Sequence, residues 1–125
     1  MQTGKRIAVP ILFFLGMAMG AAVARADGFD DVFPIMTQDG GDTSPGCRGC
    51  HMGTGAPCAR FRWGETQDEV LSCLQTLGYV DGGSLSRLAD RLDPAVGTGD
   101  MPQGGRPWNN DELQFLRAWL GYTVP

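Results

Sequence analysis

The spacing of hydrophobic residues along the chain predicts an all-α protein with long loops. Hydrophobic residues recur at helical intervals in residues 27–38, 66–78 and 109–121, and over a shorter stretch at 84–92. No stretch alternates convincingly between hydrophobic and polar residues, so no strand is expected. The pattern therefore predicts three to five short helices, joined by segments rich in Gly and Pro at 39–46, 53–64 and 93–107.

The predicted helices are bounded by capping residues. Thr66 with Glu69, and Asn109 with Glu112, have the spacing of capping boxes, and Gly78 and Gly121 follow the last hydrophobic residues. The predicted buried faces consist of Phe29, Val32, Phe33 and Met36; Val70, Leu71, Leu74 and Leu77; Leu85, Leu88, Ala89 and Leu92; and Leu113, Leu116, Trp119 and Leu120.

Residues 1–26 have the pattern of a signal peptide. Lys5 and Arg6 precede an apolar stretch over residues 7–23, and residues 24–26 read Ala-Arg-Ala, as signal peptidase requires. Cleavage would leave one domain over residues 27–125, exported to the periplasm. The alternative is an uncleaved membrane anchor, because the apolar stretch approaches the length of a bilayer span.

Removal of residues 1–26 makes the chain strongly acidic. It leaves seven Arg and no Lys against fourteen acidic residues, a formal net charge of about −7. This charge disfavours nucleic acid and anionic membrane surfaces as partners and favours a protein with a basic docking surface. Acidic charge also serves solubility alone.

The sequence Cys47-Arg48-Gly49-Cys50-His51 is the C-x-x-C-H signature of haem c attachment. Two intervening residues let both thiols reach the two vinyl groups on one porphyrin edge, and the following His places its imidazole under the iron. A thioredoxin-like redox pair shares the two cysteines but expects a βαβ pattern that is absent here. A zinc site would need further ligands, and the chain has one His.

A single His means that a second axial ligand must be another residue type, and Met is the usual choice. Three Met follow residue 26. Met52 adjoins His51 and cannot reach the opposite haem face, and Met36 belongs to a predicted core stripe. Met101 lies fifty residues after His51 in a Gly- and Pro-rich loop, and is the predicted ligand. The alternative is a loop Met that packs on the core.

Cys58 and Cys73 are the two cysteines that remain once the motif pair is assigned. In an oxidising compartment they are expected to form a disulfide, with two buried free thiols as the alternative. The bridge would join the irregular segment to the helix at residue 66 and have a structural role. The closed loop of about fifteen residues corresponds to about 3 kcal/mol in the chain-entropy model.

These residues resemble the small class I cytochromes c. Residues 32–36, Val-Phe-Pro-Ile-Met, are similar to the family's lead-in helix, and residues 101–105, Met-Pro-Gln-Gly-Gly, to its Met loop before the final helix. The resemblance implies thioether links at Cys47 and Cys50, His51 as proximal ligand and Met101 as distal ligand. It also implies that the first and last helices cross near Phe33 and Trp119, and that the Pro57 carbonyl accepts the His51 N–H.

The resemblance implies electron transfer by one covalent haem c, without transformation of a substrate, so the protein is not expected to be an enzyme. One alternative is a haem subunit of a dehydrogenase or oxidase complex. Another is a five-coordinate haem that binds gases or reacts with peroxide. Arg60, Arg62 and Arg106 are candidates to lie near the haem propionates, or else are ordinary surface arginines.

Overall fold

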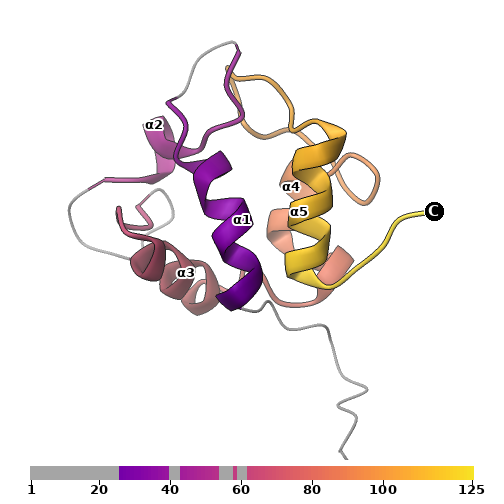
Figure 1. The fold of residues 1–125 in the computed structure, drawn as a ribbon, viewed down its shortest axis with the longest axis horizontal. Coiled ribbons are helices and arrows are strands. Elements are labelled where there is room, and N and C mark those ends of the chain that lie inside the picture. The colour runs from indigo at the N-terminus through magenta and orange to yellow at the C-terminus, as the bar shows by residue number, and fades with distance from the viewer. Residues whose placement is uncertain (1–25, 40–42, 54–57, 59–61) are drawn as a thin grey trace, which may run out of the picture.

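The computed structural model describes residues 26–39, 43–53, 58 and 62–125 (Figure 1). The predicted signal segment, except Ala26, and the residues Pro57 and Arg60 lie outside the described residues. The described part is mostly helical and contains five α-helices, one short 3-10 helix and no strand, which confirms the all-α prediction for these residues. The elements are α1 (Ala26–Met36), α2 (Arg48–His51), α3 (Gln67–Thr76), η1 (Gly83–Leu85), α4 (Arg87–Leu92) and α5 (Asn110–Leu120).

Helices α1 and α5 form the main packing contact and lie side by side in Figure 1. Gly28 allows their close approach, because a Cβ atom at that position would lie 3.0 Å from the Cα atom of Trp119. The Phe29 ring packs on the Trp119 indole with 4.8 Å between ring centroids. The expected crossing of the first and last helices is thus present, and it involves Trp119 as expected. Phe33 packs on Phe29 of the same helix, with 5.6 Å between ring centroids.

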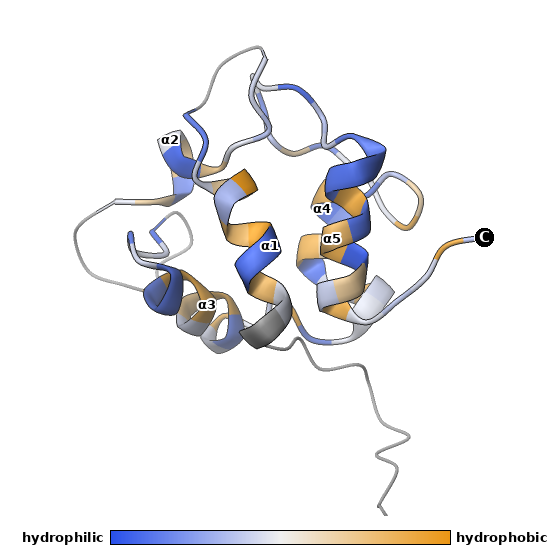
Figure 2. Ribbon diagram, viewed as in Figure 1, coloured by the Kyte–Doolittle hydropathy of each residue, from blue (hydrophilic) through white to orange (hydrophobic). Residues whose placement is uncertain are grey.

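The core lies between the hydrophobic faces of these helices. Hydrophobic and hydrophilic residues alternate along α1, α4 and α5 in Figure 2, as expected for helices with one buried face. The fully buried side chains with the largest volumes include Trp119, Phe29, Met36, Leu74, Leu116 and Leu120. Met36 is therefore a core residue, as its place in the hydrophobic stripe predicts.

The capping boxes form as predicted at both well-marked helices. The side chains of Thr66 and Asn109 accept hydrogen bonds from the backbone N–H groups of Glu69 and Glu112. The carboxylates of the two Glu residues in turn accept hydrogen bonds from the backbone N–H groups of Thr66 and Asn109. Helix α5 ends at Gly121, which has a φ of 78°, a conformation that glycine adopts without strain.

The prediction of one helix over residues 84–92 is wrong for the first turn, residues 84–86. The chain instead forms η1, and α4 begins only after Ser86, whose hydroxyl accepts a hydrogen bond from Ala89 N. Because the 3-10 turn has a different periodicity, Leu85 leaves the predicted buried face and is 89% exposed. Leu88 and Leu92 remain buried, as predicted.

The predicted disulfide is present. Cys58 and Cys73 are bonded, with 4.7 Å between their Cα atoms. The bridge attaches the segment that follows α2 to the buried side of α3, where Cys73 is part of the core. Within the described residues, no helix has the length and hydrophobicity that crossing a membrane requires.

Candidate haem site

One cavity of about 340 Å³ brings together the four predicted ligand and attachment residues. Cys47, Cys50, His51 and Met101 all line it, although Met101 is fifty residues from His51 in the sequence. Their side chains supply two thiols, an imidazole and a thioether. The sequence predicted this set from the motif and from elimination among the Met residues, and all four residues line the same cavity.

The C-x-x-C-H motif forms its own turn of helix. Cys47 caps α2, and its carbonyl accepts hydrogen bonds from the backbone N–H groups of Cys50 and His51 at 3.3 and 2.9 Å. The Cys47 N–H donates to the Met36 carbonyl at 2.8 Å, which fastens this turn to the end of α1. The sequence pattern gave no sign of this short helix, because four residues are too few to show periodicity.

The two motif cysteines are not bonded to each other; Cys47 is buried and Cys50 is exposed. Burial, and to a lesser extent the neighbouring Cys50, raise the pKa of the Cys47 thiol to about 12. A redox-active cysteine pair has the opposite property, because the reactive thiol needs a lowered pKa. Cys47 therefore lacks the property that the attacking thiol of such a pair requires.

An aromatic pair forms the wall beside His51. The Trp63 indole is stacked on the imidazole, with 4.3 Å between centroids and 12° between planes. The Trp63 backbone N–H also donates to the His51 carbonyl at 2.8 Å. Trp63 is buried and lines the cavity, and within the described part of the chain its indole Nε1 has no hydrogen-bond partner. The Tyr79 ring packs edge-on with the Trp63 indole, with 6.3 Å between ring centroids.

Helix α4 forms the side of the cavity next to Met101. Leu88 and Leu92 line the cavity, and the Met101 N–H donates to the carbonyl of Arg91 in the same helix at 2.9 Å. This hydrogen bond holds the Met101 backbone close to α4. The loop position of Met101 was predicted, but its attachment to this helix was not.

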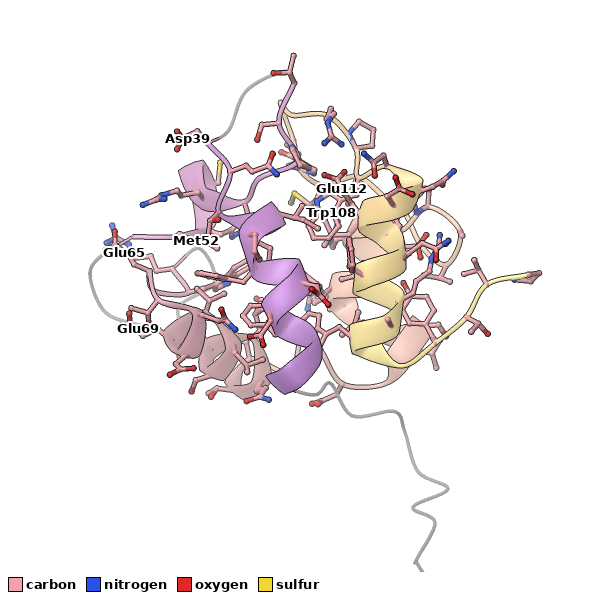
Figure 3. The ribbon with its side chains drawn as sticks, viewed as in Figure 1. Asp39, Met52, Glu65, Glu69, Trp108 and Glu112 are labelled. Atoms are coloured by element: carbon pink, nitrogen blue, oxygen red, sulfur yellow. A yellow bond between two sulfur atoms is a disulfide. The ribbon has the colours of Figure 1, made fainter. Side chains whose placement is uncertain are left out.

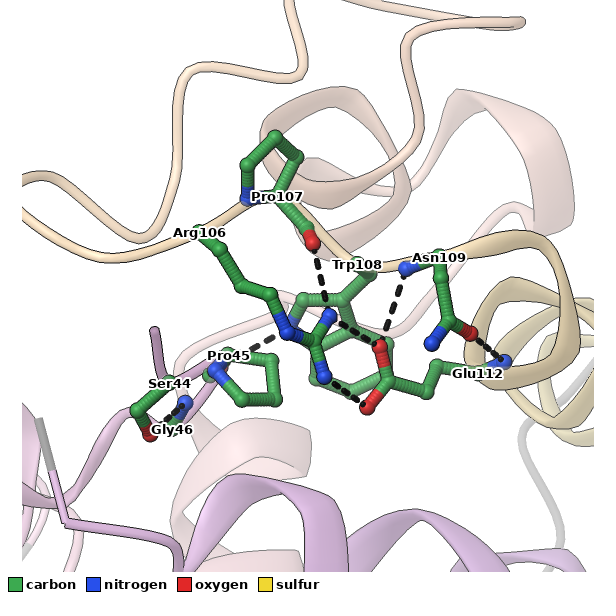
Figure 4. Close-up of polar contacts among 8 residues, drawn as sticks. All are labelled: Ser44, Pro45, Gly46, Arg106, Pro107, Trp108, Asn109 and Glu112. Carbon is green, nitrogen blue, oxygen red and sulfur yellow. Dashed lines mark hydrogen bonds and ion pairs between the residues drawn. The ribbon is translucent and has the colours of Figure 1, made fainter. Parts of the chain in front are cut away.

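Trp108 joins the two loops at the edge of the cavity. Its indole N–H donates to the Pro45 carbonyl at 2.9 Å, and the backbone N–H of Arg106 donates to the Ser44 carbonyl at 3.0 Å (Figure 4). These contacts connect the segment before Cys47 to the segment after Met101. The sequence did not predict this role of Trp108, because the two partners of the indole bond are 63 residues apart.

Arg106 is engaged with a carboxylate of the protein itself. Its guanidinium donates two hydrogen bonds to Glu112, at 2.6 and 2.9 Å (Figure 4). Glu112 lies next to Trp108 at the start of α5 (Figure 3). The hydrogen bond from Arg106 is the main reason that the pKa of Glu112 is lowered, against the smaller opposing effect of burial. Arg62 is exposed and does not line the cavity.

The arginines that do line the cavity are Arg87 and Arg91. They are one helical turn apart on α4, beside the buried Leu88 and Leu92, so the two guanidinium groups share one face. Arg87 lies over the Tyr79 ring at 5.8 Å from its centroid. Arg87 and Arg91 are four residues apart, and each precedes a buried Leu of α4. This spacing is the signal from which the sequence could have predicted that both arginines line the cavity.

In the described residues, no group of three or more His, Cys, Asp or Glu side chains is arranged to hold a metal ion. Comparisons with protein-family models, with curated proteins and with solved structures gave no match. The resemblance to class I cytochromes c therefore stays a prediction that its motif residues carry.

Proposed function

We propose that this protein is an electron carrier with one covalently attached haem c, bound in the cavity between α2 and the Met101 loop. The observation that carries the proposal is that two thiols, one imidazole and one thioether line the same cavity. A C-x-x-C-H motif alone is a sequence pattern. The proposal also requires that the fold bring Met101, the predicted distal ligand, to the same cavity as this motif.

The chemistry of the cavity fits the group. Its wall has apolar side chains from α4, which suit a hydrophobic macrocycle, and its volume lies in the range of small-molecule sites. The buried Trp63 Nε1, which has no partner within the described residues, would gain one from an acceptor bound there. Arg87 would offset part of the negative charge of carboxylates on the bound group, whereas the Arg91 guanidinium is paired with the Asp100 carboxylate at 2.7 Å.

Each attachment residue has a distinct role in this proposal. Cys47 and Cys50 would hold the haem through thioether bonds, each formed by addition of an S–H group across a vinyl group, which needs no oxidant. His51 and Met101 would ligate the iron and leave no open position for a substrate. When bound, haem supplies a one-electron Fe(III)/Fe(II) couple between a donor and an acceptor protein.

The rest of the molecule is consistent with a class I cytochrome c-like fold. The first and last helices cross at Gly28 and Trp119, and the other end of α1 holds the turn that carries the motif through the Met36 carbonyl. We propose export to the periplasm from the pattern of residues 1–26, and partners with basic docking surfaces from the acidic charge of residues 27–125. The same arrangement would serve a free carrier or a haem subunit of a larger redox complex.

Absorption spectra of the oxidised and reduced protein test the ligand assignment. We expect the weak near-infrared band of Met-ligated ferric haem in the wild type and its loss in Met101→Ala. Met52→Ala is the matched control, because Met52 adjoins His51 but does not line the cavity. Persistence of the band in Met101→Ala would overturn the distal assignment, and would leave the covalent attachment to be judged separately.

A further inference from the structure

Asp93 is a fully buried carboxylate that lies outside the haem cavity. It follows α4, and it accepts hydrogen bonds from Arg117 Nε at 2.7 Å, from Arg117 Nη2 at 3.0 Å and from the Tyr122 hydroxyl at 2.8 Å. Burial alone would raise the pKa of Asp93, but the hydrogen bonds from Arg117, Tyr122 and Ala95 together outweigh it, so the pKa is lowered. The charged carboxylate thus connects the end of α4 to α5.

The same residue begins the loop that leads to Met101. Asp93 Oδ1 accepts the Ala95 N–H at 3.0 Å, and its carbonyl accepts the N–H groups of Val96 and Gly97 at 3.2 and 3.0 Å. At Gly97 a Cβ atom would lie 2.3 Å from the Cα atom of Asp90, so the loop passes too close to α4 for any larger residue. The first turn of the loop is therefore built on Asp93 and packed against the helix.

The loop then returns along the C-terminal turn of α4. The N–H of Gly99 donates to the Asp90 carbonyl, and the N–H of Met101 donates to the Arg91 carbonyl, both at 2.9 Å. The last carbonyls of a helix have no partners inside the helix, so the loop supplies them. The Met101 backbone is thus held by the same helix end that Asp93 joins to α5.

We propose that Asp93, through its ion pair with Arg117, is a positioning residue for the distal ligand Met101. This inference rests on the proposed haem ligation. The opposing interpretation is that Asp93 stabilises the whole fold and has no particular effect on Met101. The two differ in one respect: a positioning residue, when altered, releases Met101 from the iron before the helices unfold.

Urea titration of the oxidised, haem-loaded protein separates these interpretations. The near-infrared Met-to-iron band follows Met101, and far-ultraviolet circular dichroism follows the helices. In Asp93→Asn, which keeps the shape but removes the charge, we expect the band to be lost at a lower urea concentration than the helical signal. Arg117→Lys, which keeps the charge but cannot donate two bonds from a guanidinium, should show the same separation to a smaller degree.

Two core variants serve as matched controls. Leu116→Ala lies next to Arg117 in α5, and Ile35→Val is a milder change in α1; both side chains are buried and neither hydrogen-bonds the loop. In these controls the band and the helical signal should shift together. If Asp93→Asn fails to fold, the urea titrations of Arg117→Lys and Ile35→Val are compared instead, and they distinguish the two interpretations in the same way.

The outcomes distinguish the inference from the function on which it rests. A wild-type protein with the band, whose Asp93 and Arg117 variants lose both signals together as the controls do, would overturn the positioning role alone. A wild-type protein with covalent haem but without the band would overturn Met101 ligation, and with it this inference.

Discussion

Glu112 illustrates how a single residue combines local and long-range contacts. One carboxylate oxygen accepts the N–H of Asn109 at 2.9 Å and closes the capping box of α5. The same carboxylate accepts two hydrogen bonds from Arg106, in the segment that leads away from Met101. The negative charge also lies in the first turn of a helix, where the helix dipole favours it.

The lowered pKa of Glu112 predicts sensitivity to acid. An unfolded Glu has a pKa of about 4.3, so the stabilisation is fully present above that pH and is lost as the pH falls through the lower folded value. Asp93, whose pKa is also lowered, acts in the same direction. We expect the free energy of unfolding, measured by urea denaturation, to fall below about pH 4.3.

Glu112→Gln should make this decline shallower. Arg106→Met should have a similar effect, because it removes the partner that lowers the pKa of Glu112. Parallel pH profiles for the wild type and both variants would show that the pair does not contribute to the acid response.

At this scale the sequence predicted the residues with strong local signatures. Cys47, Cys50 and His51 belong to one short motif, and Met101 followed because the chain has a single His. Trp108 was not predicted, because its role depends on a hydrogen bond to a residue 63 positions away. Arg87 lines the cavity and was not predicted either, although its spacing from Arg91 beside a buried stripe is a local signal.

Among the helices, those with capping boxes were predicted well. The predicted limits of α3 and α5 agree with the structure because Thr66 and Asn109 fix where each helix begins. The stretch at 84–92 was predicted as one helix because Leu85 continues the hydrophobic spacing. Gly82 and Gly83, both at positive φ, and the cap at Ser86 interrupt it, and a hydrophobic pattern does not register such a break.

Paired substitutions test this description of α4. Leu85→Ala removes an exposed side chain and should change the free energy of unfolding by no more than about 0.5 kcal/mol. Leu88→Ala removes a buried side chain of the cavity wall and should cost about 2–5 kcal/mol. Urea denaturation measures both. Equal losses at the two positions would mean that Leu85 packs in the core as its spacing suggests.

In the whole molecule, the cavity is formed by parts that no local pattern connects. The turn with Cys47 follows α1, the Met101 loop returns on α4, and Trp108 joins the two at the start of α5. The sequence predicted the all-α class from short periodicity, and the Cys58–Cys73 bridge from the two cysteines that remain outside the motif. The resemblance implied that the first and last helices cross, but the backbone contacts that bring the two loops together were not predicted, because they join residues far apart in the sequence.

The central claim is covalent attachment of a haem through Cys47 and Cys50. The most direct measurement is the intact mass of the purified protein under denaturing conditions, beside that of the Cys47→Ser, Cys50→Ser double variant. We expect the wild-type chain to be heavier than its amino acids by one haem, and the variant to have the mass of its amino acids alone. A wild-type mass equal to that of the polypeptide alone, after expression in a host that makes cytochromes c, would contradict it.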